Sequence, residues 1–455
     1  MLSLFTKQMK AAGLPETVIR TFGSYYEQLK AGKLGLIPKT QIEPPSAANV
    51  IDYSALADYR RQSILKNIAV IKLNGGLGTS MGLSGPKSLL PVKGNMNFLD
   101  IITRQVLSLR ASTGYEALLL LMNSYSTEAE TLEYLEKYPD LKRQKLPISF
   151  LQHKFPRIRQ DDLKPYENED ADKMWNPPGH GDIYAALSAS GILEQMIAEG
   201  YRYAFVSNSD NLGATVDTSI PAYMEAHEIH FLMEVCARTD ADKKGGHLCQ
   251  DKHGQLMLRE IAQCPPDELD EFQDIERYNY FNTNNLWIDL KALEWNLITG
   301  EGIMPLPLIV NPKTVDGTPV FQLETAMGAA IGVFNGAKAL LVPRSRFAPV
   351  KKNNDLLAIW SDLFDLNDQY QVVMRRGVTS IPPIELDQRY YGNIDQLLMR
   401  FKEGVPSLID CKSLKITGDI SFGEDVICEG DVSLIAQTPV FVKSKLLTGE
   451  IAFNP

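Results

Sequence analysis

Apolar residues recur at helical spacing near the start of this chain and cluster in short, strand-length runs farther along, and this change of pattern divides the chain into segments. Near the N-terminus, apolar residues fall at helical spacing between Val18 and Leu29, after Pro15 and before Gly32. Proline suits the first turn of a helix and glycine its end, so this spacing predicts one helix. Residues 33–45 are rich in glycine and proline, which is typical of a linker.

From about residue 66, short apolar runs of strand length alternate with helical patterns such as Phe98 to Leu109. The expected strands are Ile68 to Leu73, Ala117 to Met122, Ile148 to Gln152 and Tyr203 to Ser207. This alternation predicts an α/β fold with a doubly wound, mainly parallel sheet. In such sheets ligands bind at the carboxyl ends of the strands, and two of these ends carry unusual polar sequence.

The last 50 residues change character. Three segments repeat one pattern of a glycine, an acid and a β-branched residue, beginning at Gly418, Gly430 and Gly449. Short β runs with such turns favour the coils of a parallel β-helix, and a small antiparallel sheet is the alternative. The sequence therefore predicts an N-terminal helical segment (1–48), a catalytic domain (49–390) and a C-terminal β-helix domain (391–455).

Composition narrows the class of protein. The 455 residues are 44% hydrophobic and 22% charged, with a formal net charge of −10, which argues against a nucleic-acid partner. No apolar stretch approaches the roughly 20 residues that a membrane span needs, and we expect no membrane partner. The five cysteines form no C-x-x-C pair, which is typical of reduced thiols in a cytoplasmic protein.

The strongest chemical signal is a glycine-rich loop that directly follows the strand ending at Leu73. It contains Gly75, Gly76, Gly78, Gly82 and Gly85, and then Pro86 and Lys87. Closely spaced backbone N–H groups, a following helix N-terminus and a mobile lysine would together suit a triphosphate. A dinucleotide fingerprint fails at Met81 and a Walker loop fails at Pro86, so neither an oxidoreductase nor a P-loop ATPase is favoured.

The loop resembles the nucleotide-binding loop of the UDP-sugar pyrophosphorylase family, in particular its eukaryotic-type UTP–glucose-1-phosphate uridylyltransferases. Eight further segments match that group in order, at residues 152–158, 176–184, 207–211, 244–248, 260–263, 281–287, 323–326 and 342–351. The resemblance implies a Rossmann-like, GT-A-like nucleotidyltransferase domain with a C-terminal left-handed parallel β-helix. It also implies that UTP and glucose 1-phosphate react to give UDP-glucose and pyrophosphate.

The same resemblance assigns roles to individual residues. Lys87 and Lys351 would be the catalytic lysines on the phosphates, and Asp210 would hold a Mg²⁺ cofactor. The nucleotide would contact Leu73, Asn74, Gly75, Gly76, Gly78, Thr79, Gln152, Pro178 and Gly179. The sugar phosphate would contact His180, Asn208, Gly246, Glu260 and Asn284.

The residues leave other functions open. A UDP-N-acetylglucosamine pyrophosphorylase is disfavoured because its glycine loop is shorter, with arginine after the threonine where this chain has Ser80. A broad-specificity UDP-sugar pyrophosphorylase uses the same chemistry. A catalytically inactive UTP-binding homologue is a different class, against which the retention of Lys87, Asp210 and Lys351 argues. The exposed sheet edges of a β-helix also suggest a homo-oligomer formed through the C-terminal domain.

Overall fold

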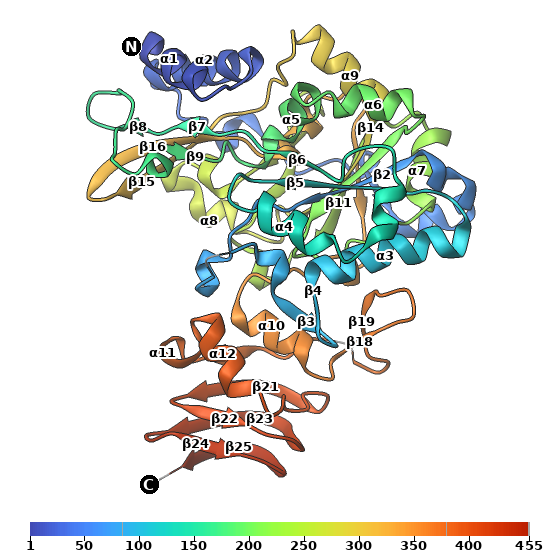
Figure 1. Ribbon diagram of the computed structural model, residues 1–455, viewed down its shortest axis with the longest axis vertical. Coiled ribbons are helices and arrows are strands. Elements are labelled where there is room, and N and C mark those ends of the chain that lie inside the picture. The colour runs from blue at the N-terminus through green and yellow to red at the C-terminus, as the bar shows by residue number, and fades with distance from the viewer. Residues whose placement is uncertain (84, 379, 454–455) are drawn as a thin grey trace.

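A large mixed sheet forms the centre of the protein in the computed structural model, which describes residues 1–83, 85–378 and 380–453. Its strands follow in the order β1 (Val50–Asp52), β17 (Lys338–Leu341), β11 (Phe231–Ala237), β14 (Tyr280–Asp289), β10 (Tyr203–Asn208), β2 (Ile68–Leu73), β5 (Leu118–Asn123) and β6 (Ser149–Leu151). Figure 1 labels β2, β5, β6, β11 and β14 of this sheet. Every neighbouring pair along this order is parallel except the two that involve β14. The predicted mainly parallel sheet is therefore confirmed, with β14 as an antiparallel insertion. A side hairpin of β12 (His247–Gln250) and β13 (Leu256–Arg259) attaches to β14.

Both faces of this sheet are buried. Alternate residues of β2 enter two different cores: Ile68 and Val70 one, Ala69 and Ile71 the other. The first core includes residues of α3 (Phe98–Thr113), α4 (Glu128–Leu135), α7 (Ser219–Ala226) and α10 (Asn353–Trp360). The second includes residues of α5 (Ile183–Ala189), α6 (Ile192–Ala198) and α9 (Leu290–Thr299). Helices on both faces confirm the doubly wound architecture and explain why the central strands are almost wholly apolar.

The N-terminal segment contains two helices, α1 (Leu2–Ala11) and α2 (Glu16–Lys30), of which the periodicity predicted only the second. Phe5 of α1 packs against Phe22 and Tyr26 of α2, with ring centroids 5.1 and 4.9 Å apart. The pair covers a smaller sheet region of β7 (Phe155–Pro156), β8 (Ile158–Arg159), β9 (Trp175–Asn176), β15 (Ile309–Val315) and β16 (Thr318–Glu324). The segment predicted as a linker is docked, because Ile37 N–H donates to the Gln263 carbonyl at 2.7 Å.

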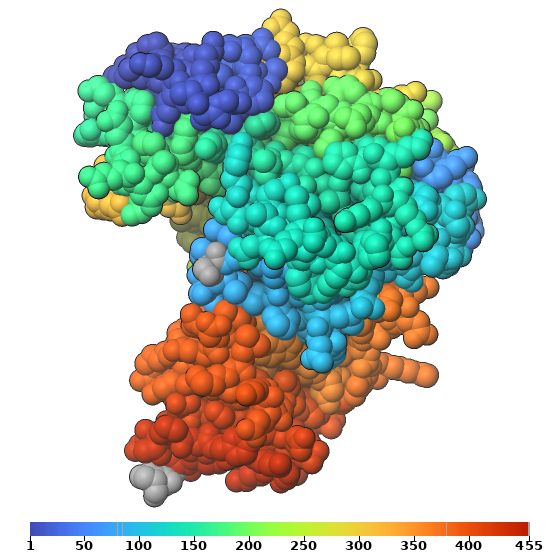
Figure 2. All heavy atoms as spheres, viewed as in Figure 1, coloured from blue at the N-terminus to red at the C-terminus, as the bar shows by residue number. Residues whose placement is uncertain are grey.

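The C-terminal region forms a lobe at the opposite end of the molecule from the N-terminus (Figures 1 and 2). Its strands β20 (Ile384–Leu386), β21 (Cys411–Thr417), β23 (Val426–Ala436) and β25 (Lys445–Phe453) form one sheet, and β22 (Ile420–Phe422) pairs with β24 (Val440–Val442). All these pairings are parallel, so the antiparallel alternative is wrong. The three repeated glycines, Gly418, Gly430 and Gly449, all have positive φ, which explains why glycine recurs at these turns.

Shorter elements join these regions. They are the pairs β3 (Pro91–Lys93) with β4 (Met96–Asn97) and β18 (Phe364–Leu366) with β19 (Val372–Met374), and the helices α8 (Leu269–Phe272), α11 (Gln388–Tyr391) and α12 (Ile394–Phe401). No helix in the described residues combines the length and the apolar character that crossing a membrane requires.

Candidate active site

The carboxyl ends of β2 and β10 lie side by side, because Leu73 is the register partner of Asn208 in a parallel pair. The glycine loop follows β2 and the acidic segment Ser-Asn-Ser-Asp-Asn ends β10. The sheet topology alone therefore brings together two segments that are more than 120 residues apart in the chain.

The glycine loop closes on itself before any α-helix begins. Lys87 N–H donates to the Gly76 carbonyl at 3.1 Å, and Leu77 and Pro86 form an isolated β-bridge. Two 3₁₀ turns lie in and after the loop, at Thr79–Met81 and Lys87–Leu89, and the next α-helix starts only at Phe98. The expected helix N-terminus directly after the loop is therefore wrong: a β-hairpin intervenes, and the loop's own backbone groups must serve the anion.

Positions in the loop differ in how much room they leave. A Cβ at Gly78 would lie 2.2 Å from Leu83 Cδ1, so a side chain there would have to displace Leu83, whereas Gly76 is exposed and open. Asn74 uses its side-chain amide on Asn123 (2.7 Å) and Thr131 (3.1 Å), which anchors the start of the loop. Leu73 and Thr79 lie at the start of the loop and in its first turn.

Two lysines meet at one carboxylate oxygen. Lys87 Nζ donates to Oδ2 of Asp210 at 2.7 Å and also to the Val350 carbonyl, and Lys351 Nζ donates to the same Oδ2 at 2.9 Å. Burial by itself would raise the pKa of Asp210, but the charges of Lys351 and Lys87 outweigh it and hold that pKa below its usual range. The three side chains carry a net charge of about +1, which suits phosphate groups.

The second oxygen of this carboxylate offers a metal ligand. Oδ1 of Asp210 is buried and has no hydrogen-bond partner among the described residues. The described chain contains no group of three or more histidine, cysteine, aspartate or glutamate side chains able to hold a metal ion by themselves. Magnesium commonly takes one or two protein carboxylates together with substrate phosphates and water, so a single free carboxylate oxygen fits it.

The segment before Lys351 runs beside the segment after β10. Asn211 and Pro349 form a β-bridge, and Val350 N–H donates to the Asp210 carbonyl at 3.1 Å. A Cβ at Gly213 would lie 2.5 Å from the Ser345 carbonyl oxygen. This close backbone contact fixes where Lys351 enters the site, although 53% of its side chain is exposed and its ammonium group can reach new partners.

A second group of residues gathers near the end of β6. Gln152 Nε2 donates to the Gly179 carbonyl at 2.8 Å, and its Oε1 lies 3.1 Å from where a Cβ on Gly75 would stand. Gly179 has φ +76°, and a Cβ there would lie 2.4 Å from the Thr325 carbonyl oxygen, so only glycine fits. Thr325 N–H in turn donates to the Pro178 carbonyl at 2.9 Å. The structure thus brings together the glycine loop, Gln152 and the Pro-Pro-Gly turn.

His180 follows this turn and is held in one tautomer. Its Nδ1 accepts the Met327 N–H at 2.9 Å, which leaves the proton of the neutral ring on Nε2. Burial, and then the nearby charge of Lys351, lower the pKa of His180 to about 4. The ring is therefore neutral at pH 7 and offers an N–H donor close to Lys351.

Gly246 and Glu260 touch across the β12–β13 hairpin. A Cβ on Gly246 would lie 2.7 Å from both carboxylate oxygens of Glu260, so the glycine makes room for this carboxyl group. Burial raises the pKa of Glu260 to about 7, and no charged group among the described residues offsets it. Nearby on β14, Asn284 has φ +58° where the register with β11 shifts between Glu234 and Val235. This bulge explains the unusual asparagine run in a strand.

Comparisons with known proteins agree with this arrangement. The family model described as UTP–glucose-1-phosphate uridylyltransferase matches residues 19–429. The UTP–glucose-1-phosphate uridylyltransferase of Hordeum vulgare is 40% identical, covering 95% of this chain and 93% of its own, and that of Solanum tuberosum is 41% identical, covering 93% and 89%. The UDP-glucose pyrophosphorylase of Leishmania major superposes with a TM-score of 0.92 at 40% identity, covering 99% of each chain. The chain belongs to the UTP–glucose-1-phosphate uridylyltransferase family.

Structures that carry this family's names include a Trypanosoma brucei UDP-glucose phosphorylase, which has a TM-score of 0.90 at 40% identity and covers 99% of its own chain and all of this one. A variant of the Leishmania enzyme was solved in complex with UDP-glucose, and it superposes with a TM-score of 0.91. The family fold therefore extends over the whole chain, including the parallel C-terminal strands.

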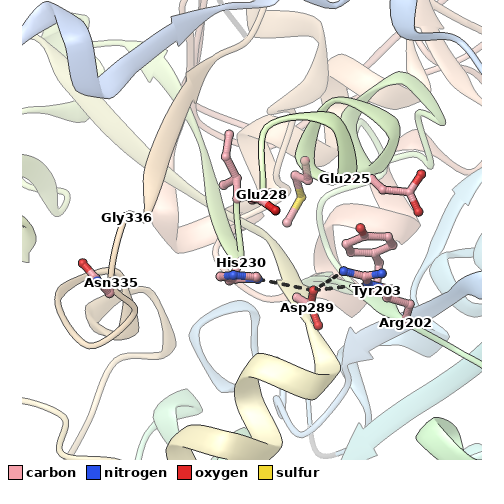
Figure 3. Close-up of a pocket in the computed structure, with 10 residues that line it drawn as sticks. Arg202, Tyr203, Glu225, Glu228, His230, Asp289, Asn335 and Gly336 are labelled. Atoms are coloured by element: carbon pink, nitrogen blue, oxygen red, sulfur yellow. Dashed lines mark hydrogen bonds and ion pairs between the residues drawn. The ribbon is translucent and has the colours of Figure 1, made fainter.

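A surface hollow of about 620 Å³ lies at the opposite ends of the central strands from the candidate site, where Tyr203 begins β10 and Asp289 ends β14 (Figure 3). Arg202 and His230 contact Oδ2 of Asp289 at 3.3 and 3.4 Å, while Oδ1 accepts backbone N–H groups at the start of α9. Asp289 therefore caps the start of α9 and pairs with Arg202, and the hollow is also lined by Glu225 and Glu228, which suits it less well to phosphate than the site at the carboxyl ends of β2 and β10.

Several residues near the site were not predicted from motifs. Asp182 accepts from His153 N–H at 2.7 Å and contacts its Nδ1 at 3.0 Å, so it ties the end of β6 to the Gly-His-Gly turn. Lys72 is buried in β2 and donates to Ser207 Oγ (2.7 Å) and to the Ala214 carbonyl (2.9 Å). Burial, and then a neighbouring guanidinium, lower the pKa of Lys72 to about 7. The sequence signal that could have identified Lys72 is its position as the lone charged residue inside an apolar strand.

Proposed function

We propose that this chain transfers the uridylyl group of UTP to glucose 1-phosphate, forming UDP-glucose and pyrophosphate. The observation that carries the proposal is the cluster in which Lys87 and Lys351 share one oxygen of Asp210, beside the glycine loop at the carboxyl ends of β2 and β10. Two anions must be brought together in this reaction, and the cluster has the positive charge that this requires.

UTP lies along the carboxyl edge of β2 in this proposal. Gln152 and the backbone of Gly179 bind uracil, because an amide and a peptide group offer the donors and acceptors that its edge needs. The loop from Leu73 to Thr79 surrounds the phosphates. Lys87 then neutralises the β- and γ-phosphates that leave as pyrophosphate.

Glucose 1-phosphate lies on the β12–β13 side. Glu260, the backbone of Gly246 and the side chain of Asn284 bind the sugar hydroxyls. His180, as a neutral Nε2–H donor, and Asn208 hold the sugar phosphate. Lys351 reaches both this phosphate and the α-phosphate of UTP, which its exposed side chain permits.

The chemical step is an in-line displacement. An oxygen of the sugar phosphate forms a bond to the α-phosphorus as the bond from that phosphorus to the bridging oxygen of pyrophosphate breaks. No side chain acts as a nucleophile, and the protein contributes alignment and charge neutralisation. Mg²⁺, held by Oδ1 of Asp210 and the substrate phosphates, would supply further charge neutralisation there.

The C-terminal strands form coils of a left-handed parallel β-helix in this proposal, which their parallel pairing supports. Phe441 and Leu446 are more than half exposed on this lobe, which supports its use in a homo-oligomer. Sedimentation velocity of the wild type against Phe441→Asp tests this use, and an unchanged sedimentation coefficient would refute it.

The absence of disulfides among five buried cysteines supports a cytoplasmic location.

The test of function is pyrophosphate release from UTP and Mg²⁺ across a panel of sugar 1-phosphates. Release with glucose 1-phosphate alone is expected, and equal release with galactose or N-acetylglucosamine 1-phosphate would favour the broad-specificity or N-acetylglucosamine alternatives. Binding of UTP without release for any sugar would favour the inactive homologue. Removing Mg²⁺ with EDTA should abolish release, and Asp210→Asn should raise the Mg²⁺ concentration required.

A further inference from the structure

A buried ion pair lies directly behind the proposed site. Glu234 of β11 is fully buried and Arg346 is 7% exposed. The guanidinium donates to both carboxylate oxygens, Nε to Oε2 at 2.8 Å and an Nη to Oε1 at 2.6 Å. Such a two-point contact fixes orientation as well as charge, which a lysine cannot do.

The pair is connected to the residues proposed to bind phosphate. The Arg346 carbonyl accepts from Asn211 Nδ2 at 3.1 Å, and Asn211 Oδ1 accepts the Ala348 N–H at 3.0 Å. Asn211 follows Asp210, and Ala348 lies three residues before Lys351. The position of Arg346 therefore determines how the two segments that carry Asp210 and Lys351 lie against each other.

The pair is also connected to the sugar side. Asn285 Nδ2 donates to Glu234 Oε2 at 3.1 Å and to the Arg346 carbonyl at 3.3 Å, and Thr283 Oγ1 donates to the Glu234 carbonyl at 2.6 Å. These two residues flank Asn284 in the bulge. Trp287 Nε1 completes the set with a bond to Glu234 Oε1 at 2.9 Å.

We propose that Glu234 and Arg346 are positioning residues that hold Asp210, Lys351 and Asn284 in mutual register, so that the metal-binding, phosphate-binding and sugar-binding groups are aligned before substrates arrive. This inference rests on the proposed function. Asn211, through the Arg346 carbonyl, and Asn285, through both Glu234 and that carbonyl, connect the pair to two sides of the site. Because a displacement of about 1 Å can reduce turnover roughly 10²-fold, loss of this alignment should slow the reaction.

The test compares Arg346→Lys with Arg344→Lys. Lysine at position 346 keeps a positive charge opposite Glu234 but cannot make the two-point contact of the guanidinium with both carboxylate oxygens. Arg344 is the control on the same segment: it also makes a two-point contact, with Asp242 at 2.7 and 2.9 Å, but its side chain is more exposed and makes no bonds to Asn211 or Asn285 among the described residues. Arg346→Lys should lower kcat by about 10- to 100-fold while the KM for UTP stays within about twofold. Arg344→Lys should leave kcat within about twofold.

Hydrogen–deuterium exchange gives a readout that is independent of turnover. Residues 208–215 and 346–351 should exchange faster in Arg346→Lys and unchanged in Arg344→Lys, even if the wild type proved inactive and the proposed function failed. If Arg346→Lys does not fold, Asn285→Ala keeps the ion pair and should still lower kcat about tenfold and raise the KM for glucose 1-phosphate. Wild-type kcat and exchange in the folded variants, or equal losses in both arginine variants, would overturn the proposal.

Discussion

Asp210 and Glu260 are two carboxylates of the same candidate site, and their surroundings shift their pKa values in opposite directions. Asp210 is buried but shares two ammonium groups, so its pKa stays below the usual range. Glu260 is buried against Gly246 without a cation, and its pKa rises to about 7. Burial acts on both, so the difference comes from the lysines.

This difference matches the two tasks proposed for these groups. A carboxylate that holds a divalent cation between phosphates must stay ionised, and its lysines can move to the phosphates when substrates bind. A carboxylate that binds neutral hydroxyls needs no counter-ion, and a nearby cation would attract the wrong anion. Pairs of groups whose surroundings separate their pKa values are typical of active sites.

The largest expected effect comes from removing the lysines on the Asp210 side. Lys351→Ala and Lys87→Ala should each lower kcat by about 10²–10³, because each removes a charge that neutralises phosphate in the transition state. Steady-state rates of pyrophosphate release measure this. The matched control is Lys352→Ala, an exposed neighbour that should leave kcat within about twofold. A folded Lys351→Ala protein as active as Lys352→Ala would contradict the role of Lys351.

Glu260→Gln should have a smaller effect, on the sugar alone. The KM for glucose 1-phosphate should rise about tenfold, because hydrogen bonds to a charged group are worth about 1.5 kcal/mol or more, while the KM for UTP should not change. In the wild type this KM should also rise as the pH falls through 7 and Glu260 takes up a proton. Glutamine should remove the part of that pH dependence that the carboxyl group causes.

The same substitution should alter stability with a definite sign. The pKa of Glu260 is higher in the folded protein, about 7, than its ordinary 4.5, so the folded state favours the proton and loses stability as the pH rises from 4.5 to 7. Glu260→Gln should therefore raise Tm at pH 8, by roughly 2 °C if about 1 kcal/mol is regained, and not at pH 4. An equal gain at both pH values would show that charge is not the cause.

Much of the fold and of the candidate site follows from the sequence. The short apolar runs of β2, β5 and β10 and the helical period of α2 predicted those elements, and a parallel sheet places the ends of β2 and β10 together. The helix α1 was missed. The expected helix after the glycine loop was replaced by a hairpin, because such short β runs carry little signal.

The pairing of Glu234 with Arg346 could not be predicted, since 112 residues separate them and no local pattern links them. The available signal was a single acid within the apolar run Phe231–Ala237, which shows that a partner is needed but not which one. The strain at Asn284 was likewise hidden, because an asparagine run has no preferred register. What the sequence lacked in each case was long-range contact information.

The smallest expected effect concerns the pKa of His180, a neutral side chain whose titration depends on the nearby charge of Lys351. Its pKa of about 4 is due first to burial and then to Lys351, so in Lys351→Ala it should rise but remain well below 6.5. Imidazole proton shifts in NMR spectra between pH 4 and 7 measure this.

The unfolded chain binds a proton at about pH 6.5 and the folded one only near 4, so His180 lowers stability as the pH falls through that window. His180→Gln, which keeps an N–H donor, should reduce that loss, and a His180 titration at its ordinary pKa would refute burial as the cause.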